Sequence, residues 1–346
     1  MKNGQELAGK VAVVTGASSG VGRAIARAFA ASGADVALIA RNGEALENAA
    51  REIRELGRRA LPLPLDVADA PAVDAAAELV VQQWGAIDIW VNDAMVSVFS
   101  PVREMTADEF RRVTEVNYLG YVYGTLAALR HMRPRNRGVI MQIGSALAYR
   151  SIPLQSAYCA SKAAIRGFTD SLRSELIHER SGVKLTMMQL PAMNTPQFEV
   201  VRNRLPGHPQ PVPPIYQPEV IARAAVKAAA KPRREVWVGW SAVKAIIGQR
   251  LIPGALDGYL ARNAWASQQT TDLPPGHPQR HDLDNVDATL PGDRGAHGPF
   301  GARARTSSTE LAVRRSAPWL ALGAAMAVAI GWGVRRTRRP AFSWAR

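Results

Sequence analysis

Residues 10–22 read KVAVVTGASSGVG, and this stretch decides the fold of the chain. Its first six residues form a short apolar run rich in β-branched side chains, which is typical of a buried parallel strand. Three glycines, Gly16, Gly20 and Gly22, follow at once, and an alanine-rich helical stretch comes next. Glycines at such a turn let the backbone approach a diphosphate closely, and the helix N-terminus then meets its charge. The pattern therefore predicts a nucleotide-binding strand, turn and helix.

Apolar runs and helical stretches alternate beyond this motif, through about residue 240. Helices are expected over residues 107–131, 156–180 and 218–230. Strands are expected over residues 10–15, 35–40, 60–65, 87–92, 138–145, 183–190 and 235–240. Alternation of this kind predicts an α/β protein with a doubly wound Rossmann fold and a seven-stranded parallel sheet. The hydrophobic content of 47% is enough for a sizeable core.

Tyr158 and Lys162 carry the main chemical signal in the sequence. They lie four residues apart in an expected helix, which places a phenol and an ammonium on one face a turn apart. A phenol normally keeps its proton to a pH near 10. A neighbouring cation stabilises the phenolate, so we expect Lys162 to lower the pKa of Tyr158 and allow proton transfer near neutral pH.

The TGxxxGxG spacing and the Tyr-Lys step together resemble the short-chain dehydrogenase/reductase superfamily, over about residues 7–240. The resemblance implies a catalytic tetrad. Tyr158 would give or take the proton of the substrate oxygen, Ser145 would hydrogen-bond that oxygen, and Lys162 would hold the nicotinamide ribose. Asn117 would link Lys162 to water. The cofactor-binding residues that the resemblance implies, besides Tyr158 and Lys162, are Gly16, Ser18, Ser19, Gly20, Val21, Gly22, Arg41, Asp66, Val67, Asn92, Ala94, Pro191 and Thr195.

Two segments depart from the family pattern. Where the family usually shows NNAG, this chain has Asn92-Asp93-Ala94-Met95, and the family's PG dipeptide has become Pro191-Ala192. An ionised Asp93 accepts hydrogen bonds but cannot donate one as an amide does, and Met95 brings a flexible apolar side chain. The cofactor contacts at these two segments are therefore expected to differ in detail.

The end of the second expected strand, VALIARN, indicates the choice of cofactor. An acidic residue there would bind the ribose 2′-hydroxyl of NAD. Ala40 is instead small and neutral, and Arg41 follows it. A guanidinium pairs bidentately with phosphate, so the sequence predicts NADP(H). The alternative is that Arg41 is a solvated loop residue.

The C-terminal part of the chain has a different composition. Residues 1–265, the expected NADP-binding catalytic domain, carry a net charge of +9, residues 266–310 carry −2 and residues 311–346 carry +7. Half of the total of +14 thus lies in the last segment, which argues against a nucleic-acid groove. Residues 266–310 are rich in Pro, Gly and Asp and are expected to form a flexible linker, with their histidines solvated and no metal site.

An uncharged stretch lies within that last segment. Residues 316–334 (SAPWLALGAAMAVAIGWGV) are flanked by arginines on both sides. A helix of this length covers about 28 Å, close to the ~30 Å of a bilayer core. We expect a membrane-spanning helical extension, with a surface-lying or core helix as the alternatives. The N-terminus has no apolar signal stretch, so the catalytic domain is expected to stay on the cytoplasmic side.

The sequence thus predicts an NADP(H)-dependent oxidoreductase that interconverts a hydroxyl and a carbonyl on a hydrophobic ketone or alcohol. The single cysteine, Cys159, excludes an intrachain disulfide and fits a reducing compartment. A homo-oligomer is compatible with these features. The alternative function is a membrane-bound scaffold or sensor that binds NADP(H) without turnover.

Overall fold

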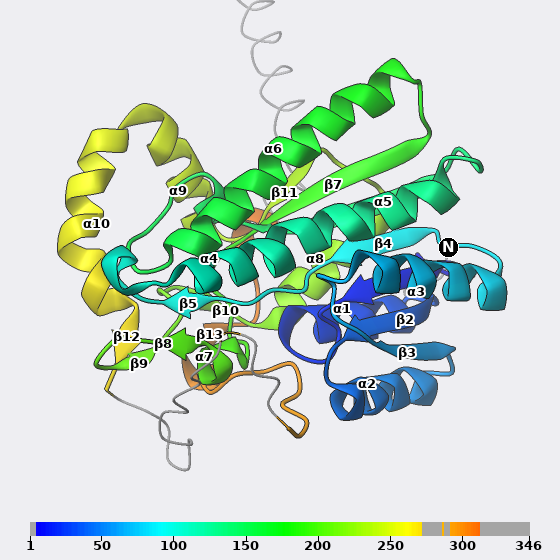
Figure 1. Ribbon diagram of the computed structural model, residues 1–346, viewed down its shortest axis with the longest axis horizontal. Helices are drawn as coiled ribbons and strands as arrows, with labels where there is room; N and C mark the ends of the chain where they lie inside the picture. Colours follow the sequence, from blue (N-terminus) through cyan, green and yellow to red (C-terminus); the bar gives the residue numbers. More distant parts are fainter. Residues whose placement is uncertain (1–4, 272–285, 287–290, 312–346) are drawn as a thin grey trace, which may run out of the picture.

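The computed structural model describes residues 5–271, 286 and 291–311, and its centre is a seven-stranded sheet (Figure 1). All the strand pairs are parallel, in the order β11-β7-β6-β4-β1-β2-β3. The strands are β1 (Val11–Thr15), β2 (Asp35–Ala40), β3 (Ala60–Pro64), β4 (Ile89–Asn92), β6 (Gly138–Ser145), β7 (Val183–Leu190) and β11 (Glu235–Trp237). The predicted doubly wound fold is confirmed.

Helices cover both faces of the sheet (Figure 1). One face packs against α1 (Gly20–Ala31), α2 (Gly43–Glu55) and α8 (Pro218–Ala230). The other packs against α3 (Ala70–Trp84), α5 (Gly120–Met132) and α6 (Ser156–His178). Each face has its own apolar core, with Phe29 fully buried in the first and Trp90 in the second. Since both faces are buried, the strands read as continuous apolar runs rather than alternating ones.

The helix expected over residues 107–131 is interrupted. It consists of α4 (Ala107–Thr114), a π-helical turn (Glu115–Leu119) and α5. Asn117 lies in the π turn, where its side chain donates to the carbonyl of Val96 at 2.9 Å and accepts from the Val96 amide at 2.8 Å. A π turn inserts an extra residue into a helix and is frequent at functional sites. The predicted unbroken helix is therefore wrong, because Asn117 is turned to hold the loop after β4.

Short elements surround the carboxyl ends of the strands. They include three two-stranded sheets, formed by β5 with β8, β9 with β12 and β10 with β13. Their bounds are β5 (Val98–Phe99), β8 (Arg202–Asn203), β9 (His208–Pro209), β10 (Ile215–Tyr216), β12 (Gln269–Thr270) and β13 (Ala304–Arg305). The helices here are α7 (Gln197–Val200), α9 (Trp240–Leu251) and α10 (Pro253–Ser267). They make the walls of the cavity described below.

The structure differs from the predicted linker (residues 266–310) over residues 291–310, which pack on the Rossmann domain. Asp293 pairs with the buried guanidinium of Arg23 on α1, with Nη2 and Oδ2 3.0 Å apart. The carbonyl of Gly295 accepts the amide of Gly20 at 3.1 Å. Phe300 is 4% exposed, and its ring lies edge-on to Phe198, 5.8 Å away. Specific polar and aromatic contacts thus hold a segment whose composition indicated a tether.

The predicted membrane-spanning stretch, residues 316–334, lies outside the described residues. Within residues 5–271 and 291–311, no helix has the length and apolar content that crossing a membrane requires.

Candidate active site

A cavity of about 710 Å³ opens at the carboxyl ends of the parallel strands. In doubly wound folds this edge of the sheet is where ligands bind, and 710 Å³ is within the usual range for a small-molecule pocket. Many of the predicted site residues line it. They are Gly16, Ser18, Ser19, Gly20, Val21, Arg41, Asp66, Val67, Ala94, Ser145, Tyr158, Lys162, Pro191 and Thr195.

Gly22 does not line the cavity but shapes the turn beneath it. A Cβ at this position would lie 2.4 Å from the carbonyl oxygen of Gly16 and 2.8 Å from a carboxylate oxygen of Asp93. Contacts that short are not tolerated, so α1 can approach β1 and β4 this closely only with glycine here. Gly22 therefore allows the close packing of α1 on which the turn depends.

Asn92 is also absent from the cavity wall, and its side chain differs from the predicted cofactor contact. The side chain is fully buried in the core. Its amide group donates to Gln142 Oε1 at 2.9 Å, and its oxygen accepts from Trp90 Nε1 at 2.8 Å. A buried amide needs such partners. Asn92 thus holds β4 to β6 and α5 from inside.

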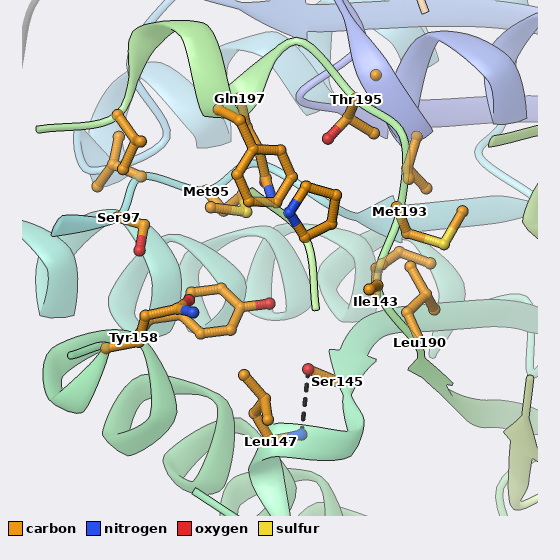
Figure 2. Close-up of a pocket in the computed structure, with 18 of the residues that line it drawn as sticks. Met95, Ser97, Ile143, Ser145, Leu147, Tyr158, Leu190, Met193, Thr195 and Gln197 are labelled. Atoms are coloured by element: carbon orange, nitrogen blue, oxygen red, sulfur yellow. Dashed lines mark hydrogen bonds between the residues drawn. The ribbon is translucent and has the colours of Figure 1, made fainter. Parts of the chain in front are cut away.

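Ser145 and Tyr158 meet inside the cavity (Figure 2). Ser145 ends β6 and its hydroxyl accepts from the amide of Leu147 at 3.1 Å. Tyr158 lies in the first turn of α6, and its phenol lies on the same side of the cavity as the Ser145 hydroxyl (Figure 2). The end of a strand and the start of a helix thus place two hydroxyls together, where both reach a substrate oxygen.

Lys162 lies one turn after Tyr158 and is 2% exposed. Its ammonium donates to the hydroxyl of Tyr121 at 2.9 Å and to the carbonyl of Ile143 at 2.8 Å. Lys162 Nζ is also 5.6 Å from the centre of the Tyr158 ring. The tetrad member Asn117 instead contacts Ser161, on the same helix, at 3.3 Å. The predicted residues therefore gather around one end of α6, with Asn117 behind the wall.

Tyr121 is a site residue that the sequence reasoning missed. Its hydroxyl accepts from Lys162 and donates to the carbonyl of Ile143 at 3.0 Å, so it fixes the position of the ammonium. Its ring centre lies 4.6 Å from Lys162 Nζ, within cation-π range. The available signal was its spacing, since it follows Asn117 by four residues and thus shares a face with it.

The pKa of Tyr158 differs from the predicted lowering. Burial of the phenol raises its pKa above the usual value, the nearby Ser145 hydroxyl opposes that rise, and Cys159 and Asp93 add to it. Lys162 is itself desolvated, and burial lowers its pKa. Desolvation is thus the largest influence on the pKa of each group, and Tyr158 keeps its proton, as a proton donor to a carbonyl oxygen does.

Asp93 stands where the family pattern has an asparagine, and its side chain lines the same cavity. Burial raises the pKa of this carboxyl, while the charge of Lys162 and a hydrogen bond from the Gly22 amide lower it. In turn, the Asp93 charge raises the pKa values of both Tyr158 and Lys162. Asp93 is therefore electrostatically connected to both proton-handling groups.

Asp93→Asn is expected to move the pH profile of kcat/KM to lower pH. Removing the negative charge lowers the pKa values of Tyr158 and Lys162, and a shift of about one unit corresponds to about 1.4 kcal/mol. Because the pKa of Asp93 is raised, wild type and variant should converge at acid pH, where wild-type Asp93 is protonated. Asp170→Asn, the same charge change at an exposed site paired with Arg234, is the control. If the pH profiles of Asp93→Asn and wild type superimposed, the charge of Asp93 would have no effect on the pKa values of Tyr158 and Lys162.

The other end of the cavity has the features of a nucleotide site. Arg41 and Asp66 line it beside the glycine-rich turn. The pKa of the Asp66 carboxyl is lowered overall. Burial alone would raise it, but the Ala68 amide and the charges of Arg112 and Arg41 have the larger combined effect, so the carboxyl stays ionised. Thr195 Oγ1 is buried at the wall and has no hydrogen-bond partner within the described structure. An unpaired buried hydroxyl beside a glycine cradle and an arginine fits a ligand rich in acceptor oxygens, such as a dinucleotide.

Comparison with known proteins agrees with this geometry. The short chain dehydrogenase family matches residues 10–205. The chain belongs to this family. Among the relatives, the uncharacterized oxidoreductase YxnA of Bacillus subtilis is 35% identical over 268 residues, which cover 76% of this chain and 75% of YxnA. The human dehydrogenase/reductase SDR family member 7 is 41% identical over 175 residues, 49% of this chain, and the match spans about half of the human protein (52%).

Solved structures of the family have the same fold. A metagenomic short-chain oxidoreductase in complex with NADP is 29% identical with a TM-score of 0.57, and the match covers 67% of this chain and 98% of that one. An alcohol dehydrogenase from Thermococcus sibiricus, complexed with 5-hydroxy-NADP, is 30% identical with a TM-score of 0.57 over 66% of this chain and 95% of the other. The predicted family membership is thus confirmed.

Proposed function

We propose that the chain is an NADP(H)-dependent oxidoreductase that interconverts a hydroxyl and a carbonyl. The observation that carries this proposal is the meeting of Ser145 and Tyr158 hydroxyls in one cavity, with Lys162 a turn behind. When bound, the nicotinamide supplies or accepts the hydride. Two of the solved relatives are complexes of NADP or a derivative of it, which supports the choice of cofactor.

The roles of the side chains follow from their positions. Tyr158 gives its proton to the substrate oxygen during reduction and takes it back during oxidation. Ser145, whose hydroxyl lines the cavity together with Tyr158 (Figure 2), hydrogen-bonds and orients the same oxygen. Lys162, held by Tyr121 and Ile143, offers its charge to the phenolate as it forms. In the nucleotide half, Arg41 would meet a 2′-phosphate and Thr195 would hydrogen-bond the cofactor.

The substrate in this proposal is hydrophobic. The cavity wall carries many apolar side chains, among them Val96, Phe99, Leu147, Met193 and Phe198. A site of this kind binds apolar groups and leaves the reacting oxygen to Ser145 and Tyr158. A panel of hydrophobic ketones and alcohols, assayed by NADPH absorbance, tests the proposal. NADPH binding with no turnover of any compound would instead support the scaffold or sensor, which Asp93 and Met95 favour because they depart from the family pattern.

We also propose that residues 316–334 anchor the protein to a membrane, with the catalytic domain on the cytoplasmic side. The full chain should stay with membranes through a carbonate or high-salt wash, because salt screens the attraction of arginines to anionic lipid but not burial of apolar surface. A chain ending at Leu311 keeps the packed segment 291–311 and is the control, which the wash should release. Release of the full chain by the same wash would contradict the anchor.

A further inference from the structure

Exposed apolar side chains gather on the two helices α9 and α10. They form an arm at one side of the molecule, drawn in yellow (Figure 1). Ten large hydrophobic residues are exposed in the described structure, and six of them belong to this arm. Single exposed hydrophobic residues are ordinary, whereas a group of them marks an interaction surface. The six are Trp240, Ile247, Leu251, Ile252, Tyr259 and Trp265.

Helix α9 is apolar on two sides. Ala242 and Ile246 are buried against the domain. Trp240, Ile247 and Leu251 are exposed, and their spacings of seven and four residues place them within about 20° of one line along a helix. Burial of Ala242 and Ile246 is therefore enough to explain why α9 packs on the domain. A second apolar stripe, with Leu251 73% exposed, remains for another contact.

The charges on the arm are mainly positive. Lys244, Arg250 and Arg262 are exposed between the apolar residues. The single acidic residue of the two helices, Asp257, is paired with Arg150 at 2.5 Å. A second copy of the arm would bring like charges together in a symmetric dimer. Aromatic and aliphatic side chains interspersed with lysine and arginine instead fit an anionic lipid surface, where tryptophan and tyrosine rings favour the interface.

The last residues that the structure describes lie beside the arm. Glu310 accepts the amide of Gly239, just before α9, at 2.6 Å, and Thr309 accepts from Trp240 Nε1 at 3.0 Å. The described chain thus ends at Leu311 beside the first turn of α9. The uncharged stretch 316–334 begins five residues later. Five extended residues reach at most about 18 Å, so an anchor formed by that stretch would leave α9 close to the bilayer.

The arm is also a wall of the cavity. Leu256 and Leu260 of α10 line it, together with Ala245 of α9. Lys244 and Tyr259 line it as well and are exposed to the outside, Tyr259 by 59%, so they stand at its rim. Arg150, which follows the turn after Ser145, holds both helices through Gln249 and Asp257. The exposed face of the arm is thus continuous with the entrance to the proposed active site.

We propose that the α9–α10 arm lies on the surface of a lipid bilayer and turns the mouth of the cavity toward it. A hydrophobic ketone or alcohol then enters from the lipid, past Tyr259, without crossing water. This inference rests on the proposed membrane anchor and the proposed hydrophobic substrate. The contact between the arm and the bilayer can be measured without any assay of turnover.

A fluorescent probe at Leu251 tests the contact in the full chain. Cys159, the sole native cysteine, is buried, so Leu251→Cys can be labelled selectively with an environment-sensitive maleimide. Ile177→Cys is the matched control, because Ile177 is equally exposed (71%) but lies near the end of α6, on the far side from the arm (Figure 1). Both proteins are bound to vesicles of phosphatidylcholine and phosphatidylserine.

With the vesicles, we expect the Leu251 probe to shift to the blue and to be quenched by nitroxide-labelled lipid. We expect its quenching by aqueous iodide to be several-fold weaker than that of the Ile177 probe.

Equal iodide quenching at the two positions would overturn the proposal while leaving the anchor intact. If the Leu251 probe were protected from iodide without lipid, and more so at higher protein concentration, the proposal would be overturned, because a second copy of the chain would then cover the arm. Failure of the protein to float with vesicles would overturn both arm and anchor. NADPH titration of the same samples tests the proposed oxidoreductase separately.

Discussion

Tyr158→Phe is expected to reduce kcat by roughly 10²- to 10⁴-fold, the usual contribution of a general acid or base. The change removes only the hydroxyl that meets Ser145, and the ring remains beside Lys162. Binding of NADPH, measured by its fluorescence, should therefore stay within a few-fold of wild type. Steady-state rates with the substrate found by the ketone and alcohol panel provide the comparison.

Tyr123→Phe is the matched control for this substitution. Tyr123 is a partly buried tyrosine on α5 that packs against the core and does not line the cavity. Loss of its hydroxyl should leave kcat close to wild type. If Tyr158→Phe and Tyr123→Phe were equally active, the proton would come from another group, and the mechanism assigned to Ser145, Tyr158 and Lys162 would fail.

The features predicted well from the sequence are those with local signals. The strand, glycine turn and helix of residues 10–22 are contiguous, so their pattern is complete within one window. Tyr158 and Lys162 lie on one helix, so their spacing alone places them on one face. The seven parallel strands could be counted because most of them are buried in the sheet and are therefore mainly apolar, as in β1, where all five residues are buried.

The features that sequence reasoning missed depend on distant partners. The side chain of Asn92 joins Gln142, 50 residues away, and this contact keeps it in the core, where the sequence alone suggested a cofactor contact. Asp293 pairs with Arg23 across 270 residues, so a Pro- and Gly-rich segment is held on α1. The raised pKa of Tyr158 follows from burial by the surrounding chain, which a four-residue spacing does not reveal. In each case, tertiary contacts override the local expectation.

Arg41 occupies the position from which discrimination between NADPH and NADH is expected. It follows Ala40 at the end of β2 and lines the cavity close to the glycine-rich turn. Its charge lowers the pKa of Asp66, which places the guanidinium within electrostatic reach of this acidic side chain of the cavity. A carboxylate at the end of β2 would repel a 2′-phosphate, but here the strand ends in alanine. We therefore expect the local charge to favour the phosphorylated cofactor.

Arg41→Ala is expected to weaken NADPH binding by roughly 10- to 150-fold, since hydrogen bonds to charged groups contribute about 1.5–3 kcal/mol. NADH lacks the 2′-phosphate, so its dissociation constant should change little, and the preference for NADPH should largely disappear. Fluorescence titration with each cofactor measures both constants. Arg27→Ala removes the same charge from an exposed position on α1 that does not line the cavity, and it should leave both constants unchanged. An equal loss of affinity for NADPH and NADH in Arg41→Ala would show that this guanidinium supports the site as a whole and does not recognise the phosphate.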